Sequence, residues 1–365
     1  MAELVAAVPE LLRPEQGAQH YAEAVVTAVA ACAADTAGQT CYICYGEGDE
    51  EEGLVRGCSC RGESGFAHVS CLARQAQVAV ERGGGPRFDR WYSCGLCEQE
   101  YHGDVRCALG WACWKTYLGR PEESLLRREA MKQLGNGLYD AYRACRALSV
   151  REAHLSLLRR IGAPEGDILA ARGNLARTYR ALGRSKEALR IVRDAYSKHC
   201  RLLGEDSRES LALAENYASS LGGQGRYGEA KALLRKTIPV ARRVLGESHI
   251  LTLRMRWAYA RALYADSGTL DDLRAAEAAL RTTRRVLGGG HPMMGEIERG
   301  LQRKMDDLRD AMKLLDETVL TARRVLGGAH PLAAGIEVEL RDVQAAFRDR
   351  LVFLYAVELD ARSSS

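Results

Sequence analysis

Seven cysteines and one histidine between residues 41 and 97 constrain the fold of this chain more than any other feature. They form four close pairs: Cys41 with Cys44, Cys58 with Cys60, His68 with Cys71, and Cys94 with Cys97. Zinc takes four thiolate or imidazole ligands in a tetrahedron, and its protein ligands come in closely spaced pairs. The eight residues therefore predict two structural Zn²⁺ ions, each held by four side chains.

A disulfide framework is the main alternative use of so many cysteines. It needs an oxidising compartment and is typical of short secreted chains. This chain has 365 residues, and its first residues, MAELVAAVPELLRPE, are acidic, unlike a secretory leader. The apolar residues 24–34 are too few to span a bilayer, which takes about 20 residues. We therefore expect reduced cysteines, a cytoplasmic location and no membrane span.

The charge distribution argues against nucleic acid as a partner. The net charge of +4 is spread over 52 basic and 48 acidic residues, and no block of Lys and Arg stands out. Nucleic-acid-binding proteins concentrate basic residues in a patch. Beyond the cysteine-rich region Ala, Leu, Arg and Glu dominate, which favours helix. The composition therefore predicts a mainly α protein.

The segments between the cysteine pairs are polar and rich in glycine, so they cannot build a core of their own. Metal must supply the folding free energy, and its apparent binding free energy is ~10–16 kcal/mol per site in small zinc peptides. The spacing alone leaves two arrangements open, in which the pairs share ions sequentially or interleave. In both, four protein ligands close each site, so the metal is structural and no catalytic residue is predicted.

The order of the pairs resembles the RING-CH (RING-variant) zinc finger of membrane-associated and viral ubiquitin ligases. The resemblance rests on the phrases CYIC, GCSCRGESGFAHVSCL and CGLC, and on the long gap before the histidine. It implies a cross-brace, in which one zinc is held by Cys41, Cys44, His68 and Cys71 and the other by Cys58, Cys60, Cys94 and Cys97. PHD fingers share the ligand order, but they usually have Cys-x2-Cys as the second pair and a shorter gap.

The resemblance also implies a docking surface for a ubiquitin-conjugating enzyme. Ile43 matches the position that docks this enzyme, and Leu96 and Trp91 are expected as further contacts, although Trp91 can instead wedge the zinc core. Two positions depart from the pattern. Gln75 stands where the family commonly has Trp, and Glu98 stands where many active RINGs have Arg or Lys.

A second pattern follows the cysteine-rich region. Similar segments recur around six glycines at intervals of 43, 42, 42, 42 and 39 residues, namely Gly119, Gly162, Gly204, Gly246, Gly288 and Gly327. Such a period predicts a solenoid of stacked helix pairs. Each Leu-Gly or similar boundary is expected to end one helix, because glycine accepts the left-handed conformation of a C-cap.

The repeat resembles the tetratricopeptide repeat in its 42-residue form, as in kinesin light chains. The resemblance is carried by residues 174–183 and 216–225, which share an Asn at the start and a Gly at the end, and by the LGxxH boundaries. It weakens at residues 265–272, and a helix at residues 335–361 is expected to cap the stack. Asn174, Arg177, Asn216 and Arg261 fall at or near groove-facing positions, where they can hold an acidic or extended peptide or be ordinary solvated side chains.

Together these patterns predict a small two-zinc cross-brace domain followed by an α-helical solenoid. We expect a helical segment at residues 1–38, the RING-CH domain at 39–103 and the repeats with their cap at 104–361. The predicted function is a ubiquitin ligase that recruits a ubiquitin-conjugating enzyme through the zinc domain and a protein substrate through the repeats. The alternatives are a non-enzymatic interaction scaffold and a PHD-like reader of histone tails.

Overall fold

A computed structural model describes residues 12–48, 52–82, 88–265 and 282–288, together with residues 291 and 341. The chain divides into two compact units, residues 1–288 and 289–365, and nearly all described residues belong to the first. The turn expected at 265–272 and the cap expected at 335–361 lie almost entirely outside the described residues.

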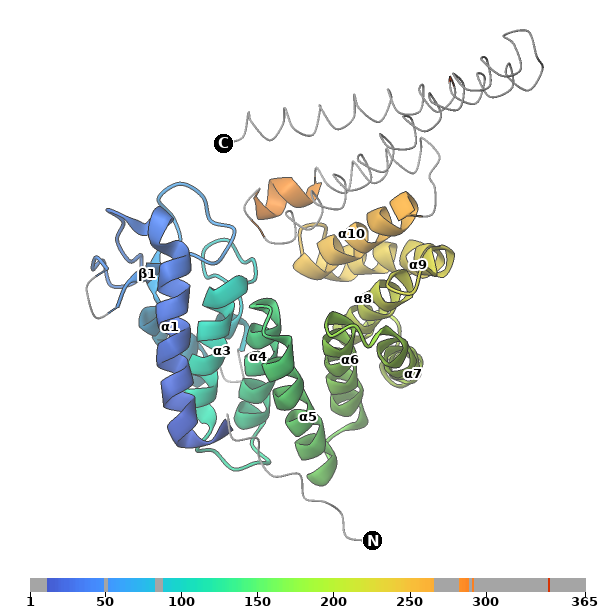
Figure 1. The fold of residues 1–365 in the computed structure, drawn as a ribbon, viewed down its shortest axis with the longest axis horizontal. Helices are drawn as coiled ribbons and strands as arrows, with labels where there is room; N and C mark the ends of the chain where they lie inside the picture. Colours follow the sequence, from blue (N-terminus) through green and yellow to red (C-terminus); the bar gives the residue numbers. More distant parts are fainter. Residues whose placement is uncertain are drawn as a thin grey trace, which may run out of the picture. The chain divides into compact units, whose positions relative to one another are not determined.

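The described part is mainly helical, as the composition predicts (Figure 1). Its elements in chain order are α1 Pro14–Thr36, β1 Leu54–Val55, β2 Ala67–His68, α2 Val69–Arg82, the 3-10 helix η2 Phe88–Trp91, α3 Gly103–Tyr117, α4 Leu125–Asp140, α5 Ala144–Arg160, α6 Glu165–Ala181, α7 Ser185–Leu203, α8 Arg208–Gly222, α9 Tyr227–Leu245 and α10 Ile250–Ala265. Among these helices none is both long and apolar enough to cross a membrane.

The cysteine-rich region has little regular structure apart from one small sheet and one helix. Strands β1 and β2 pair antiparallel, with Leu54 opposite His68 and Val55 opposite Ala67. Helix α2 begins directly after β2, so that Cys71 lies in its first turn. We call residues 40–100 the metal module.

Helix α3 lies between α1, α4 and the metal module. Every residue from Val105 to Trp114 is buried, because α1, α4 and the metal module pack on different sides of the helix. The His20 ring of α1 lies 4.9 Å from the Trp111 ring, and the Tyr117 ring lies 5.6 Å from Phe88 and 5.9 Å from Trp91. A helix that is buried on all sides is stable only when other elements surround it in this way.

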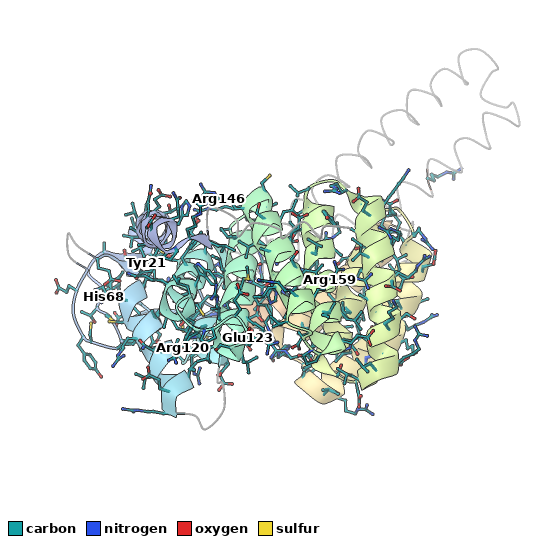
Figure 2. All side chains as sticks on the ribbon, turned by 90° about the horizontal axis from the view of Figure 1, so that it is seen from below. Tyr21, His68, Arg120, Glu123, Arg146 and Arg159 are labelled. Carbon is teal, nitrogen blue, oxygen red and sulfur yellow. The ribbon has the colours of Figure 1, made fainter. Side chains whose placement is uncertain are left out.

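The repeats form helix pairs with the predicted 42-residue register. Buried residues recur at the same positions of α7 and α9, which are Ala188, Val192, Ala195 and His199 in the first and Ala230, Leu234, Thr237 and Ala241 in the second. This spacing places one face of each helix against its neighbours. Figure 2 shows side chains filling the spaces between the helices, with Arg159 of α5 well separated from His68 of the metal module.

The helix boundaries predicted at Gly204 and Gly246 are confirmed, whereas Gly119 follows the end of α3 without a positive φ. Gly204 and Gly246 cap α7 and α9 with φ of 83° and 93°, the left-handed region that glycine adopts without steric cost. At the start of α8, the Ser207 hydroxyl accepts a hydrogen bond from the Ser210 backbone N–H at 3.1 Å. Each boundary therefore stops one helix and begins the next.

The hydrophobic core is continuous between the metal module and the first helices. One cluster includes Leu54 and Trp91 of the module, Ala24 of α1, Leu109 of α3 and Leu134 of α4. Three smaller clusters fill the spaces between α5 and α6, among α6, α7 and α8, and among α8, α9 and α10. One core thus includes residues from all three predicted segments, and the boundaries at residues 38 and 103 stay predictions.

Helices α3 and α4 approach closely because glycines lie at their contact. A Cβ atom added at Gly137 of α4 would lie 2.6 Å from the Arg106 backbone oxygen of α3. Backbone atoms cannot move aside as a flexible side chain can, so this contact requires glycine.

We predict that Gly137→Ala destabilises the protein by about 1–3 kcal/mol through overpacking. Gly228→Ala in α9 is the matched control, because a Cβ atom there meets nothing within 4 Å. The control should be neutral or stabilising by up to ~1 kcal/mol, since alanine favours helix. Thermal unfolding followed by circular dichroism measures both changes, and equal melting temperatures for the two variants would contradict the α3–α4 contact.

Candidate metal centre

The structure brings the eight predicted ligands together in two groups of four. One group is Cys41, Cys44, His68 and Cys71, and the other is Cys58, Cys60, Cys94 and Cys97, with the potential ligand atoms of each group within 4.8 Å of one another. One group combines the first and third pairs along the chain, and the other combines the second and fourth, so the pairs interleave. Of the two arrangements that the spacing leaves open, the structure has the interleaved one.

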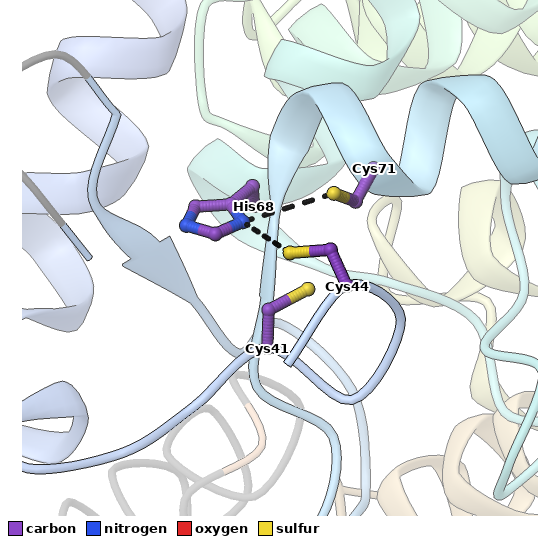
Figure 3. A group of neighbouring side chains, drawn as sticks. All are labelled: Cys41, Cys44, His68 and Cys71. Atoms are coloured by element: carbon purple, nitrogen blue, oxygen red, sulfur yellow. Dashed lines mark hydrogen bonds between the residues drawn. The ribbon is translucent and has the colours of Figure 1, made fainter. Parts of the chain in front are cut away.

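His68 presents one ring nitrogen to the first group (Figure 3). Its Nδ1 atom lies 3.4 Å from the Cys44 sulfur and 3.7 Å from the Cys71 sulfur. Its Nε2 atom lies 3.1 Å from the Glu47 carbonyl oxygen, which can only accept a hydrogen bond. That contact places the ring proton on Nε2 and leaves the Nδ1 lone pair directed at the sulfurs, which is the usual arrangement of a metal-binding histidine.

The second group consists of four sulfurs. The Cys60 and Cys94 sulfurs are 3.8 Å apart, close to the edge of a tetrahedron with metal–sulfur bonds of about 2.3 Å. Gly65, with φ of 87°, passes close beside them, and a Cβ atom there would lie 2.6 Å from the Cys60 Cβ atom. The backbone of this loop therefore closes directly over the site.

The crowded sulfurs of the second group cannot all be thiolates without a cation. Hydrogen bonds from the Cys58 and Cys97 thiols lower the pKa of Cys94 to about 2. The contact with Cys94 in turn raises the pKa of Cys58 well above its usual range. Burial and the Cys94 charge raise the pKa of Cys60 to about 12. A divalent metal ion supplies the positive charge that would hold all four in the thiolate form, and these donors fit a metal that prefers sulfur.

The first and last cysteine pairs form two loops with the same backbone geometry. Cys41 N–H donates to the Gly46 carbonyl and Tyr45 N–H to the Cys41 carbonyl; Cys94 and Glu98 N–H donate to the Gln99 and Cys94 carbonyls in the same way. Tyr45 and Glu98, each next to the second cysteine, have φ of 63° and 57°. We call residues 41–47 and 94–100 the first and second ligand loops.

An acidic side chain fixes the helix that carries Cys71. The Glu52 carboxylate accepts hydrogen bonds from the Ser70 backbone N–H at 2.7 Å and from the Ser70 hydroxyl at 2.5 Å. It lies at the N-terminus of α2, where the helix dipole favours a negative charge. Glu52 is not among the predicted functional residues, and the signal that could have identified it is an acidic side chain upstream of the helix that carries Cys71.

The three residues predicted to dock the conjugating enzyme differ from one another in exposure. Leu96 is 52% exposed on the second ligand loop, and Ile43 is half-buried on the first. Trp91 is fully buried against Tyr117, so it offers no surface to a partner. The predicted docking role of Trp91 is therefore wrong, and its alternative role as a wedge in the core fits the structure.

Three of the predicted groove residues line one cavity of about 520 Å³. They are Asn174, Arg177 and Asn216, from α6 and α8. The side chain of Arg261 lies outside the described part. Arg254 of α10 lines the same cavity and is not among the predicted groove residues. The repeat register could have identified Arg254, because Ala170 and Ala212 precede it at 42-residue intervals and also line the cavity.

Comparisons with known proteins agree with both patterns. A RING-variant domain model matches residues 41–97, and a tetratricopeptide repeat model matches residues 168–209, 210–251 and 303–332. The chain therefore contains a RING-variant domain followed by tetratricopeptide repeats. A search of curated protein sequences finds no match.

Solved structures similar to the chain have low sequence identity to it. One is a putative kinesin light chain from Podosopora anserina with nearly identical TPR-like repeats, at 17% identity over 60% of this chain and 94% of that one, with a TM-score of 0.36. Another is BtubC (BKLC) from P. vanneervenii, at 13% identity over 77% and 89%, with a TM-score of 0.37. A third is a Rap protein complexed with competence and sporulation factor, at 16% identity over 77% and 65%, with a TM-score of 0.39.

Replacing one sulfur of a group should cost one metal ion. We expect the full chain to bind two metal ions and Cys44→Ser to bind about one, because serine is a poor ligand for a soft metal site. Cys145→Ser is the matched control, since Cys44 and Cys145 are both exposed but only Cys44 belongs to a group. Elemental analysis of the purified proteins gives the count, and an unchanged count in Cys44→Ser would exclude that residue as a ligand.

Removing the metal should disrupt the first core cluster more than the repeats. Trp91, Trp111 and Trp114 belong to that cluster, whereas α8 and α9 are held by a separate one. We expect a chelator to change tryptophan emission strongly while most of the helical circular dichroism signal survives. Loss of the entire helical signal in one transition would show that the repeats cannot fold without the metal module.

Proposed function

We propose that this protein is a RING-CH-type ubiquitin ligase whose metal module recruits a ubiquitin-conjugating enzyme and whose repeats bind the substrate. The main support is the RING-variant match at residues 41–97 together with the two interleaved four-ligand groups. Tetratricopeptide repeats bind protein partners, which supports the second half of the proposal. The RING-variant match also favours this function over a PHD-like reader.

Zinc is the metal that we propose for both groups. One group offers three sulfurs and one imidazole nitrogen, and the other offers four sulfurs. Tetrahedral sites of this composition select zinc, and four protein ligands leave no position for a reacting water. Zinc would therefore fix the two ligand loops, while His68 and the cysteines would act as structural ligands. Thiolate ligands also fit a reducing compartment such as the cytoplasm.

The two ligand loops supply the surface that we propose for the conjugating enzyme. Gln75 of α2 connects them, because its Oε1 atom accepts a hydrogen bond from the Tyr42 hydroxyl at 3.3 Å and also lies against Gly95. Ile43 and Leu96 are the neighbours of Tyr42 and Gly95 in these loops. Gln75 thus joins two loops that each carry one apolar side chain at least partly open to solvent, an arrangement suited to a small docking surface.

A ligase of this type works by proximity. It holds the charged conjugating enzyme beside a substrate, so that the ubiquitin thioester meets a substrate amine in the correct orientation. No residue of the metal module needs to react. The alternative of a non-enzymatic scaffold has a specific observation in its favour, because Gln75 and Glu98 depart from the residues common in active RING domains.

We predict that Leu96→Ala and Ile43→Ala each lower ubiquitin chain formation about tenfold, the effect of losing roughly 1.4 kcal/mol from a docking contact. The assay combines the full chain with activating enzyme, ubiquitin, ATP and a panel of conjugating enzymes. Leu202→Ala is the matched control, because Leu202 is 49% exposed and Leu96 is 52% exposed. It lies at the end of α7 and should leave the rate unchanged.

The same assay distinguishes the two functions. Chain formation that depends on Leu96 supports the ligase. If no enzyme of a broad panel gives chains while two zinc ions are bound per molecule, the scaffold is the correct function.

A further inference from the structure

The second ligand loop and the residues just before it contact the repeats directly. The Tyr92 hydroxyl accepts a hydrogen bond from Arg208 of α8 at 3.3 Å. Gln99 donates to the Ser248 carbonyl in the turn before α10 at 3.3 Å, and a Glu100 carboxylate oxygen lies 3.7 Å from Arg254 of α10. The metal module is therefore held against the same helices that line the predicted groove.

Glu100 lies in a strongly positive environment. Burial raises the pKa of its carboxyl, but the charges of four arginines outweigh this effect and lower the pKa overall. In order of effect these are Arg254, Arg106, Arg208 and Arg177. The Glu100 side chain is 21% exposed and that of Arg254 is 28% exposed, so the pair is partly shielded from water, which strengthens it relative to a surface ion pair.

The other charges of the cavity are largely paired among themselves. Lys132 lies 2.6 Å from Glu129, and Asp140 lies 3.8 Å from both Arg106 and Arg177. Helices α6, α8 and α10 contribute Arg177, Arg208 and Arg254 but only one carboxylate, Glu209, to the lining. The repeat face of the cavity is therefore positive, and Glu100 is the carboxylate that pairs with Arg254.

The cavity also holds a buried polar atom without a partner. Asn216 of α8 is 6% exposed, lines the cavity, and its Oδ1 atom accepts no hydrogen bond. Buried acceptors are nearly always satisfied in folded proteins, so an unsatisfied one beside a cavity points to a missing donor. A backbone N–H of an extended peptide is a donor of the right kind, and an acidic side chain of that peptide would match the arginines.

We propose that Arg208 and Arg254, the arginines of this cavity that do not pair with Asp140, bind an acidic segment of a partner, and that Glu100 of the metal module occupies this site until the partner displaces it. The inference rests on the repeats being the partner-binding part, and it adds the partner's charge and a link to the metal module. Since the partner and Glu100 compete for Arg254, partner binding weakens the contact between module and repeats. By thermodynamic linkage, a change that strengthens the contact between module and repeats weakens partner binding by the same factor.

The test measures binding of an acidic probe to the metal-loaded full chain. The probe is a fluorescein-labelled peptide of alternating Gly and Glu, with a Gly-Gln peptide as its uncharged counterpart, and the readout is fluorescence anisotropy. Glu100→Gln should bind the acidic probe about fivefold more tightly, the lower end of typical coupling between two sites. Arg254→Gln should bind it more weakly than the unaltered protein.

Glu63→Gln is the matched control, because Glu63 is exposed on the same module and its replacement changes the net charge equally. An equal gain in Glu63→Gln and Glu100→Gln would overturn the proposal in favour of a general charge effect. Absence of probe binding in every variant, or equal binding of the uncharged peptide, would overturn it as well. The assay contains neither ubiquitin nor conjugating enzyme, so its result is independent of whether the protein is a ligase.

Hydrogen exchange gives a second readout of the same competition. Glu100→Gln and saturating acidic probe should both speed amide exchange in the segment around Ser248, where Gln99 docks. Unchanged exchange in both cases would show that the module does not leave the repeats, and would overturn the displacement step.

Discussion

The burial of α3 is the constraint on which the described unit depends. This helix carries a charge, Arg106, that is 3% exposed, and a buried charge is tolerated only when it is paired and hydrogen-bonded. Its guanidinium donates to the Trp91 carbonyl of the metal module and to Gln133 of α4, and it lies 3.8 Å from Asp140. One side chain thus requires the module, α3 and α4 to assemble together.

The metal groups and the hydrophobic core reinforce each other in this arrangement. The ligand loops have little apolar surface of their own, yet Trp91 and Phe88 follow the third ligand pair into the core beside Tyr117. A metal that orders the loops also orders these aromatic residues, and the core in turn limits where the loops can lie. The metal module is therefore a part of the same folded unit as α1, α3 and α4 and is not an appendage joined by a linker.

This arrangement gives the two proposed activities a physical connection. The surface around Ile43 and Leu96 and the cavity around Arg177 and Arg254 lie on different parts of one folded unit, and the second ligand loop belongs to both. Leu96 is exposed on this loop, whereas Glu100 at its end pairs with a repeat arginine. A partner that alters the position of this loop would act on both surfaces, which is how a substrate-binding event could reach the enzyme-docking face.

The sequence by itself determined the grouping of metal-binding residues into close pairs and the 42-residue register of the helices. Both are local or periodic, so the chemistry of cysteine pairs and of glycine caps is enough to identify them. The spacing of the pairs does not decide whether they share ions sequentially or interleave. The interleaved arrangement was predicted only from the resemblance to a family. Only the tertiary structure decided the place of α3 between α1, α4 and the metal module, the burial of Trp91 and the pairing of Glu100 with Arg254. These contacts join residues far apart in the chain, and no local pattern records which buried side chains will meet once the helices pack.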